Sequence, residues 1–287
     1  MVLNLAIRLA LTSANCCLCF ALPRRLSQAM KISDSPSPTS YDPGEYWETH
    51  LRRRPGLLGT GHRQFSLTYN EVMYQIATER LRAALDTAGI DLKGKAILDV
   101  GAGFGYFIHR FEAWGAGSIT GIELTRVGVQ ELCRAFPQHT FIQADISTPD
   151  LALPQRFDLV SAISMIFHIV DEAHFRQALN NLCAHVKPGG CLLVVDAFRP
   201  TGLPTAAHAR LRGLAAYTPI LAQQGFDAPT LFPMYHLMGR TFVPGLGPLL
   251  LNQPAILRWL ASLDRKIGAA SPSRLGWLNY LIARRPA

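Results

Sequence analysis

The sequence predicts an α/β fold in which a mostly parallel sheet carries helices on both faces. The first indication is an alternation of short apolar runs, of the kind buried in parallel sheets, with segments of helical spacing. The second is size, because 287 residues, 49% of them hydrophobic, are enough to bury a full core. We therefore expect one α/β domain whose parallel strands are joined by right-handed crossovers.

Residues 1–40 differ in composition from the rest of the chain. No acidic residue precedes Asp34, and basic residues interrupt apolar and serine-containing sequence. An organelle transit peptide and a poor secretory signal share this composition, whereas a true start at Met30 would make the first residues an annotation artefact. We expect residues 1–40 to be a leader and linker, disordered or misassigned at its start, and dispensable for folding.

Cysteine usage, hydropathy and charge bound the environment of the protein. Six cysteines in a chain of this length make no disulfide framework, and three of them lie in the leader. This cysteine usage makes a reducing cytoplasm the expected compartment. Apolar runs fall short of the ~18 residues of a membrane span. The net charge of +8 permits an acidic partner, but the arginines are dispersed, so nucleic acid is not the expected ligand.

Residues 41–94 are predicted to be helical. Between Thr68 and Ala88 apolar residues recur at three- and four-residue spacing, and Gly89 is suited to end the helix. The aromatic pair Tyr46 and Trp47 lies upstream. The segment could simply cover one edge of the sheet, or it could be an N-terminal helical lid whose two rings close over a ligand. We expect the lid.

A strand followed by a glycine loop organises the rest of the chain. The apolar run from Ala96 to Val100 contains Asp99 and is followed by glycines at positions 101, 103 and 105. Alternate glycines let the backbone turn sharply and let a ligand approach it, and the N–H groups at the start of the next helix attract an anion. The dinucleotide fingerprint places its third glycine one residue later, so this loop has a different spacing.

Carboxylates stand at the ends of the first three predicted strands. After the first strand, strands are expected at 118–122, 140–144, 157–163 and 191–195, with helices at 125–136 and 172–186 and a sharp turn at 187–190. Asp99, Glu123 and Asp145 are the three acidic residues. One of them alone would be an ordinary cap or loop charge, but ligands bind at the carboxyl ends of parallel strands. Three at successive strand ends therefore indicate a ligand site.

The segments 97–105, 121–124, 143–146, 157–160 and 187–190 together resemble the successive motifs of class I S-adenosylmethionine (SAM) dependent methyltransferases. They read Ile-Leu-Asp-Val-Gly-Ala-Gly-Phe-Gly, Gly-Ile-Glu-Leu, Gln-Ala-Asp-Ile, Phe-Asp-Leu-Val and Lys-Pro-Gly-Gly, in the family's order. The resemblance covers about residues 90–200. It implies a SAM-dependent methyltransferase domain over 95–287 with a Rossmann-like, seven-stranded, mostly parallel sheet whose last strand is antiparallel. It also implies SAM as the cofactor.

The resemblance assigns cofactor-binding roles to particular residues. The loop with Gly101, Ala102, Gly103 and Gly105 would hold the methionine end of SAM. Asp99 would act on its ammonium group, and Ser164 would contact its methionyl part. Glu123 would accept from the ribose hydroxyls, Asp145 from the adenine amino group, and Ile146 would pack on the ring. The neighbouring Tyr106 and Leu124 complete the expected binding set.

Methyl transfer needs the nucleophile, the methyl group and the sulfur to be aligned in a dry pocket. If the nucleophile is a hydroxyl group, a proton acceptor is needed as well. His168, just beyond the fourth strand, is the candidate catalytic base; its alternative role is purely structural. No metal is required, and no Cys/His spacing typical of zinc is present. The family's frequent N-methylation signature is absent after the fourth strand, where Ala162-Ile163-Ser164-Met165 stands instead. This absence speaks against adenine or glutamine amide methylation but does not identify the acceptor. We expect transfer to a small-molecule, lipid-linked or glycan-linked acceptor, with O-methylation favoured.

The C-terminal third is expected to complete the sheet. A helix is predicted over 206–224, a sixth strand over about 229–237 and the last strand over 278–285. The insertion at 238–273 includes an apolar helix over 254–267 with a basic flank, and we expect it to wall in an apolar acceptor as a lid. The alternatives are packing on the sheet edge, a dimer contact, or reversible docking on an anionic membrane.

Two other functions stay open at this point. One is a nucleotide-dependent oxidoreductase on a Rossmann fold, against which the early third glycine and Asp145 speak. The other is a non-catalytic methyltransferase-like module that binds SAM. The sequence assigns neither the methyl acceptor nor the oligomeric state.

Overall fold

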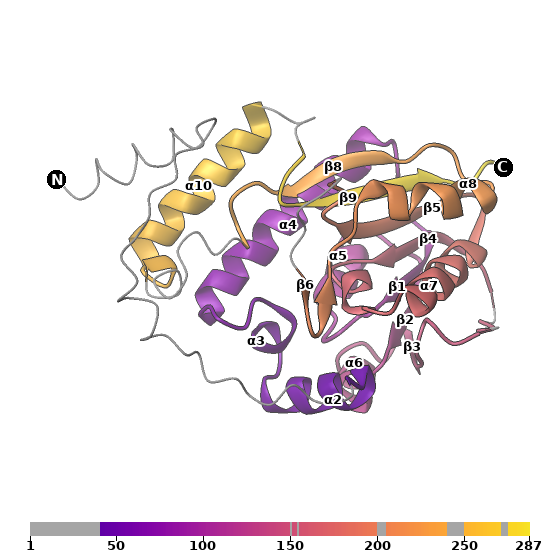
Figure 1. Cartoon of the computed structure of the whole chain (residues 1–287), viewed down its shortest axis with the longest axis horizontal. Helices are drawn as coiled ribbons and strands as arrows, with labels where there is room; N and C mark the ends of the chain where they lie inside the picture. The colour runs from indigo at the N-terminus through magenta and orange to yellow at the C-terminus, as the bar shows by residue number, and fades with distance from the viewer. Residues whose placement is uncertain (1–40, 150, 154, 200–204, 240–249, 271–274) are drawn as a thin grey trace, which may run out of the picture. The chain divides into compact units, whose positions relative to one another are not determined.

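A seven-stranded sheet in the order β3-β2-β1-β4-β5-β9-β8 runs through the computed structural model (Figure 1). Its parallel neighbours are β1 Ala96–Val100, β2 Ser118–Glu123, β3 Thr140–Gln143, β4 Phe157–Ala162 and β5 Val186–Asp196. Strand β9 (Leu278–Arg284) is antiparallel to both β5 and β8 (Thr230–Tyr235). The predicted α/β fold, mostly parallel with an antiparallel last strand, is confirmed.

The structure describes residues 41–149, 151–153, 155–199, 205–239, 250–270 and 275–287. The predicted leader and linker at 1–40 lies outside these ranges. So does most of the first part of the predicted insertion, residues 240–249. Within the described ranges, no helix combines the length and hydrophobicity that crossing a bilayer requires.

Helices cover both faces of the sheet because successive strand residues point to opposite sides. Ile97 belongs to the core shared with α4 (Leu67–Thr87), α5 (Tyr106–Ala113) and α6 (Arg126–Ala135). Leu98 belongs to the core shared with α7 (Glu172–Ala184) and α8 (Thr218–Gln223). Both side chains are fully buried, and burial of such a side chain stabilises a fold by roughly 1.5–3 kcal/mol.

The helices before the sheet begin at sequence-encoded caps. Helix α2 (Pro43–Arg53) starts at Asp42, whose side chain accepts from the backbone N–H of Glu45, and proline occupies its first turn. A short helix α3 (Leu57–Thr60) follows. Helix α4 is fixed to the sheet by two tyrosines: Tyr235 donates to the carbonyl oxygen of Met73 at 3.1 Å, and Tyr280 to that of Ala77 at 2.8 Å.

Two predicted elements differ from the observed ones. Residues 187–190, expected as a sharp turn, lie within β5 as an irregularity: Phe157 pairs with Val186, but Leu159 pairs with Cys191. Of the helix expected over 206–224, only the last part is helical in the structure, as α8. A small hairpin of β6 (Thr205–Ala206) and β7 (Ala209–Arg210) and a 3-10 turn at Leu214–Ala216 precede it. Gly213 separates hairpin and turn, and helix α8 begins beside Pro219, which suits a first turn.

Helix α10 (Pro254–Ala270) is the apolar helix predicted within the insertion, three residues longer than expected. It lies beside α4 and contacts β8 (Figure 1). Its buried Asp264 accepts from the backbone N–H groups of residues 236, 237 and 238 at 3.1, 2.7 and 2.9 Å. From α4, Arg80 donates to the carbonyl oxygens of Asp264 and Arg265, and this approach is possible because Gly268 has no side chain.

Candidate functional site

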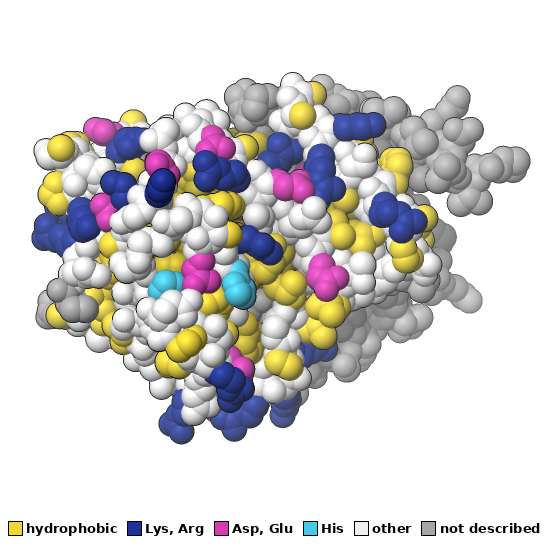
Figure 2. Space-filling view, turned by 180° about the vertical axis from the view of Figure 1, so that it is seen from behind, with side chains coloured by type: hydrophobic (Ala, Val, Ile, Leu, Met, Phe, Trp, Pro, Cys, Tyr) yellow, Lys and Arg dark blue, Asp and Glu magenta, His cyan; other side chains and the backbone are white. Residues whose placement is uncertain are grey.

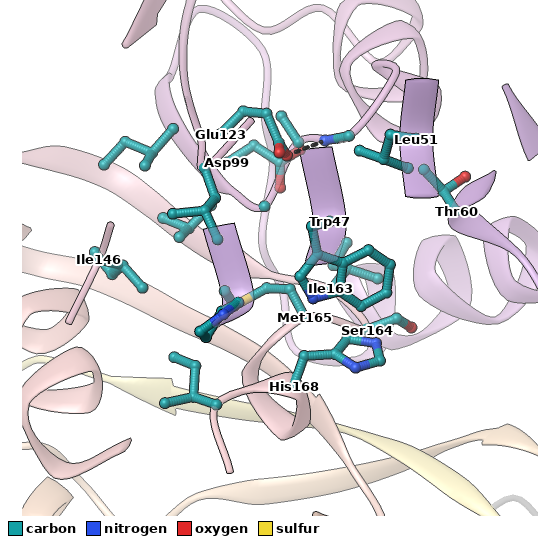
Figure 3. A pocket seen from close by; sticks show the side chains of 18 of the residues that line it. Trp47, Leu51, Thr60, Asp99, Glu123, Ile146, Ile163, Ser164, Met165 and His168 are labelled. Carbon is teal, nitrogen blue, oxygen red and sulfur yellow. Dashed lines mark hydrogen bonds between the residues drawn. The ribbon is translucent and has the colours of Figure 1, made fainter. Parts of the chain in front are cut away.

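A cavity of about 550 Å³ lies at the carboxyl ends of the parallel strands (Figure 3). Eleven of the twelve residues that the sequence indicated line it. They are Asp99, Gly101, Ala102, Gly103, Tyr106, Glu123, Leu124, Asp145, Ile146, Ser164 and His168. The twelfth, Gly105, is not part of the wall. The volume is within the ~300–1,000 Å³ of small-molecule and cofactor pockets.

The glycine loop adopts a backbone that favours glycine at all three positions. The φ angles of Gly101, Gly103 and Gly105 are 72°, 57° and 83°. Gly105 caps α5, and a Cβ atom there would lie 2.3 Å from the ring of Phe136. In this structure Gly105 allows the turn and the packing of α5 on α6, and its contact with the cofactor stays a prediction.

Asp99 is buried in the wall of the cavity. It is 3% exposed, and it accepts a 2.6 Å hydrogen bond from the hydroxyl of Ser161, its neighbour on β4. Burial raises the pKa of Asp99 to about 7, with the charge of Glu123 adding to the effect and the Ser161 hydroxyl opposing it. A cationic group placed here would favour the ionised form.

Glu123 is held from two sides at the end of β2. Its carboxylate accepts from the backbone N–H of Gly103 at 2.9 Å, and from the N–H and hydroxyl of Thr125 at 3.0 and 2.8 Å (Figure 3). These bonds fix the carboxylate against the glycine loop. A carboxylate has about four acceptor sites, so acceptor capacity remains for a ligand hydroxyl.

Asp145 and Ile146 lie at the end of β3. Asp145 is exposed, and its Oδ1 atom accepts from the N–H and hydroxyl of Ser147 at 2.8 and 2.7 Å. Ile146 is buried, and its carbonyl oxygen accepts from the side-chain amide of Asn181. One polar and one apolar side chain therefore border the same part of the cavity.

The segment after β4 brings Ser164, Met165 and His168 to the cavity. Ser164 has a φ of 56°, a left-handed conformation that non-glycine residues adopt uncommonly. Met165 packs against Gly101, where a Cβ atom would lie 2.6 Å from its side chain. His168 ends a 3-10 helix at Ile166–His168. A strained backbone at a site wall is a common mark of a functional position.

The ring of His168 is oriented by the hairpin between β6 and β7. Its Nδ1 atom lies 2.8 Å from the carbonyl oxygen of His208. Because a carbonyl only accepts, Nδ1 carries the proton and Nε2 has the free lone pair in the neutral ring. Burial lowers the pKa of His168 to about 4, so the ring is neutral at physiological pH. The ring of Trp47 meets it edge-on, with centroids 4.6 Å apart (Figure 3).

The helices before the sheet supply one wall of the cavity. Trp47 and Leu51 of α2 and Leu57 and Thr60 of α3 line it. Helix α2 is attached to α6 through Glu48, which accepts from the N–H groups of Arg126 and Val127 at 2.7 and 3.4 Å. The expectation for Trp47 therefore agrees with its position in the wall.

The position of Tyr46 differs from the expectation that its ring closes over a ligand. Its ring does not line the cavity but stacks on His208, with centroids 5.4 Å apart. Tyr46 therefore contacts the hairpin that orients His168, and it does not close over a ligand.

The insertion at 238–273 also differs from its prediction. No described residue of α10 lines the cavity; the helix packs on α4 and β8 instead. Asp264 and Arg80 explain this position, because both make hydrogen bonds across that interface. The described part of the insertion is a helix at the sheet edge, which was the alternative interpretation, and not a lid over the acceptor.

Several site residues had no recognised signal in the sequence. Ser161, a hydroxyl within the apolar run that follows Asp158, could have been noticed as a partner for Asp99. Leu51, Leu57 and Thr60 look like ordinary helix residues, and His208 acts through its backbone carbonyl. Among the described residues, no cluster of three or more His, Cys, Asp or Glu side chains is arranged to hold a metal ion.

Comparisons with known proteins agree with this geometry. A family model described as a methyltransferase domain matches residues 97–190. The tRNA U34 carboxymethyltransferase of Dichelobacter nodosus is 33% identical over 110 residues, which cover 37% of this chain and 34% of the relative. The ubiquinone biosynthesis O-methyltransferase of Serratia proteamaculans is 32% identical over 123 residues, which cover 41% and 48%. The chain thus spans half or less of the length of these two relatives.

Solved structures show the same fold. Magnesium protoporphyrin IX methyltransferase from Synechocystis PCC 6803, with bound SAM, has a TM-score of 0.54 and 16% identity over 87% of this chain and 100% of that one. The N-methyltransferase NodS from Bradyrhizobium japonicum, with S-adenosylhomocysteine, has a TM-score of 0.54 and 15% identity over 86% and 100%. The resemblance noted in the sequence is confirmed at the level of the domain: residues 97–190 match the methyltransferase domain model, and the fold is that of solved SAM-dependent methyltransferases.

Proposed function

We propose that this protein transfers a methyl group from SAM to a hydroxyl group of a small-molecule acceptor. The observation that carries the proposal is the convergence of three strand-end carboxylates and one oriented histidine on a single cavity. Asp99, Glu123 and Asp145 lie at its strand-end wall, and His168 lies beside Trp47 (Figure 3). The relatives named O-methyltransferases support the same reaction class.

The residues present fit SAM by their chemistry. SAM carries an ammonium and a sulfonium, and the buried carboxylate of Asp99 suits a cationic group. A ribose needs acceptors for two hydroxyls, and Glu123 is fixed in position by Gly103 and Thr125. The N–H groups at the start of α5 suit the SAM carboxylate. We assign Asp145 and Ile146 to the adenine, and Ser164, Tyr106 and Leu124 to the rest of the cofactor wall.

Our proposed mechanism uses His168 as the proton acceptor. When bound, SAM would supply an electrophilic methyl carbon for the acceptor oxygen, and the electron pair of the carbon–sulfur bond would remain on sulfur. His168 receives the hydroxyl proton on Nε2, because Nδ1 is committed to the carbonyl of His208. A base with a pKa of about 4 is weak. It suffices here because an oxygen that is gaining a methyl group becomes strongly acidic, so the proton leaves late in the displacement.

We also propose that residues 41–94 act as the lid of this site, with α2 and α3 excluding water during transfer. Trp47, Leu51 and Leu57 present apolar surface to the cavity. Helix α3 is held close to the glycine loop, since Tyr74 donates to the carbonyl oxygen of Thr60 at 2.8 Å and Gly103 leaves room for the Thr60 side chain. Opening this wall would admit SAM and release its product.

The two competing functions are less well supported. A nucleotide-dependent oxidoreductase would be expected to have the wider glycine spacing. A non-catalytic module would not need an oriented histidine beside the cavity. For the compartment we keep the cytoplasm as our proposal, in agreement with the free cysteines among the described residues, Cys133, Cys183 and Cys191.

Methyl transfer is tested by incubating the purified protein with methyl-labelled SAM and a cell extract. We expect one class of small molecules to become labelled, and excess S-adenosylhomocysteine to suppress the labelling. His168→Ala should fail to label the same product while still binding S-adenosylhomocysteine. A wild-type protein that binds S-adenosylhomocysteine but labels nothing in any extract would support the non-catalytic alternative.

A further inference from the structure

The cavity wall has a mainly apolar part besides the strand-end carboxylates. Trp47, Leu51, Leu57, Met165 and His168 are among its lining residues, and they come from α2, α3 and the segment after β4 (Figure 3). Four of these five side chains are apolar, and His168 is neutral at physiological pH because burial lowers its pKa to about 4. This part of the wall is therefore mainly apolar and uncharged, and Nε2 of His168 and the hydroxyl groups of Thr60 and Ser164 are its polar atoms.

The charge of the cavity wall is opposite to that of the whole chain. The chain has a net charge of +8, and on the face that Figure 2 shows the basic side chains are scattered. Among the residues described, the wall contains the carboxylates Asp99, Glu123, Asp145 and Asp171 but neither lysine nor arginine. An anion inside this cavity would find no lysine or arginine side chain of the wall to pair with.

Three arginines of neighbouring segments do not line the cavity. Arg63 is exposed, Arg110 stacks on the ring of Tyr106 at 4.8 Å, and Arg212 is paired with Glu172 at 3.0 Å. Two further histidines, His109 and His174, border the cavity only at its rim, since their side chains are 66% and 67% exposed. Neither histidine therefore offers a buried positive charge to an anion in the cavity.

From this distribution we infer that the methyl acceptor is an uncharged, ring-containing, largely apolar molecule, and not a carboxylate, a phosphate ester or a nucleic acid. The inference rests on the proposed function and specifies its substrate class. Aromatic walls such as Trp47 favour offset or edge-on contacts with a ring. Burying an unpaired anion beside carboxylates is opposed both by desolvation and by like-charge repulsion.

The chemistry of the transfer agrees with a neutral acceptor. A hydroxyl group of the ring compound forms the new oxygen–carbon bond, sulfur keeps the electron pair of the broken carbon–sulfur bond, and Nε2 of His168 takes the hydroxyl proton. The substrate stays uncharged before and after the step. A carboxylate acceptor would instead enter already ionised and would not need the base that His208 orients.

A matched pair of probes tests the inference by binding alone. The protein is first titrated with S-adenosylhomocysteine by calorimetry, which reports on the proposed function. Binding of 2-naphthol (uncharged at pH 7.5) and 2-naphthoate (anionic) to the loaded protein is then measured by ligand-observed NMR, with Trp47→Ala as the variant that locates the site. We expect 2-naphthol to bind at least about tenfold more tightly, a difference of about 1.4 kcal/mol.

A charge-adding pair of variants sharpens the test. Leu57 lines the cavity, whereas the adjacent Leu58 is 36% exposed and does not. Leu57→Lys should shift the preference toward 2-naphthoate by about tenfold, and Leu58→Lys should not change it. Wild-type protein that binds 2-naphthoate as well as 2-naphthol, or binds neither probe, would overturn the inference. Failure to bind S-adenosylhomocysteine would instead count against the proposed function.

Discussion

The Nδ1 atom of His168 donates to the backbone carbonyl oxygen of His208 over 2.8 Å. This bond joins the segment after β4, where the cofactor wall ends, to a hairpin more than thirty residues further along the chain. It leaves Nε2 as the ring atom that can take a proton. The same ring packs against Trp47 of α2, so the proposed base, the proposed lid and the hairpin meet at the side chain of His168.

Replacing His168 tests its proposed catalytic role. His168→Ala should lower turnover by a factor of ~10²–10⁴ and leave the SAM dissociation constant nearly unchanged. The matched variant His208→Ala keeps the backbone carbonyl oxygen that orients His168, and it should lower turnover far less. Because burial holds the pKa of His168 near 4, kcat at saturating SAM should not fall between pH 8 and 5.5 through protonation of this ring. Parallel losses of melting temperature and activity in His168→Ala would support a structural role instead.

Binding of SAM should depend on pH through Asp99. Burial raises the pKa of this carboxyl group to about 7, so in the free protein it is partly protonated at neutral pH. A bound ammonium group favours the ionised form, which lowers that pKa in the complex. The affinity should therefore rise from pH 6 to pH 8 and then level off, with proton release on binding. Calorimetry in buffers of different ionisation enthalpy measures both the affinity and the proton release. Asp99→Asn should remove the pH dependence of the affinity. If the affinity of that variant still rises from pH 6 to pH 8 as in the wild type, the assignment of Asp99 is contradicted.

The hydrogen bonds of Glu48 make a testable prediction about the lid. Its carboxylate accepts from the first N–H groups of α6, an arrangement that favours negative charge at a helix N-terminus. Glu48→Gln should loosen α2 and speed the dissociation of S-adenosylhomocysteine about threefold to tenfold, since hydrogen bonds to charged groups contribute roughly 1.5–3 kcal/mol, of which Gln retains a part. Stopped-flow fluorescence measures this rate. Glu45→Gln, an exposed position on the same helix, should leave it unchanged, and equal effects of both variants would argue against the lid.

Helix α10 should matter for stability and not for cofactor binding. Asp264→Ala removes the acceptor of three backbone N–H groups and should lower the free energy of unfolding by roughly 2–4 kcal/mol. Urea denaturation measures this change, with the exposed Asp227→Ala as control. The folded variant should bind S-adenosylhomocysteine normally, because no described residue of α10 lines the cavity. Loss of that binding with unchanged stability would restore the idea of a lid.

The sequence predicted local patterns better than long-range contacts. The strand ends that carry Asp99, Glu123 and Asp145 follow from short apolar runs, and each lies at the expected edge of the sheet. The packing of Gly105 on Phe136 and the pairing of Asp99 with Ser161 depend on neighbours far apart in sequence. No periodicity reports such contacts.

Two errors have a similar origin. The segment 206–224 has helical composition, but its course is set by tertiary contacts: the backbone N–H of Arg212 is bound to the buried Asp196 at the end of β5. The apolar side of α10 was correctly expected to be buried. Its partner could not be predicted, because α4 and β8 offer the same kind of apolar surface as a ligand pocket would.

The central claim is that the cavity binds SAM through the strand-end carboxylates, and titration calorimetry tests it most directly. We expect S-adenosylhomocysteine to bind the wild-type protein at one site with micromolar affinity, and NAD to give no binding heat. Glu123→Ala should weaken S-adenosylhomocysteine by roughly 1.5–3 kcal/mol, the contribution of hydrogen bonds to a charged group. Binding of NAD without any response to SAM or S-adenosylhomocysteine, or an unchanged affinity in Glu123→Ala, would contradict the account.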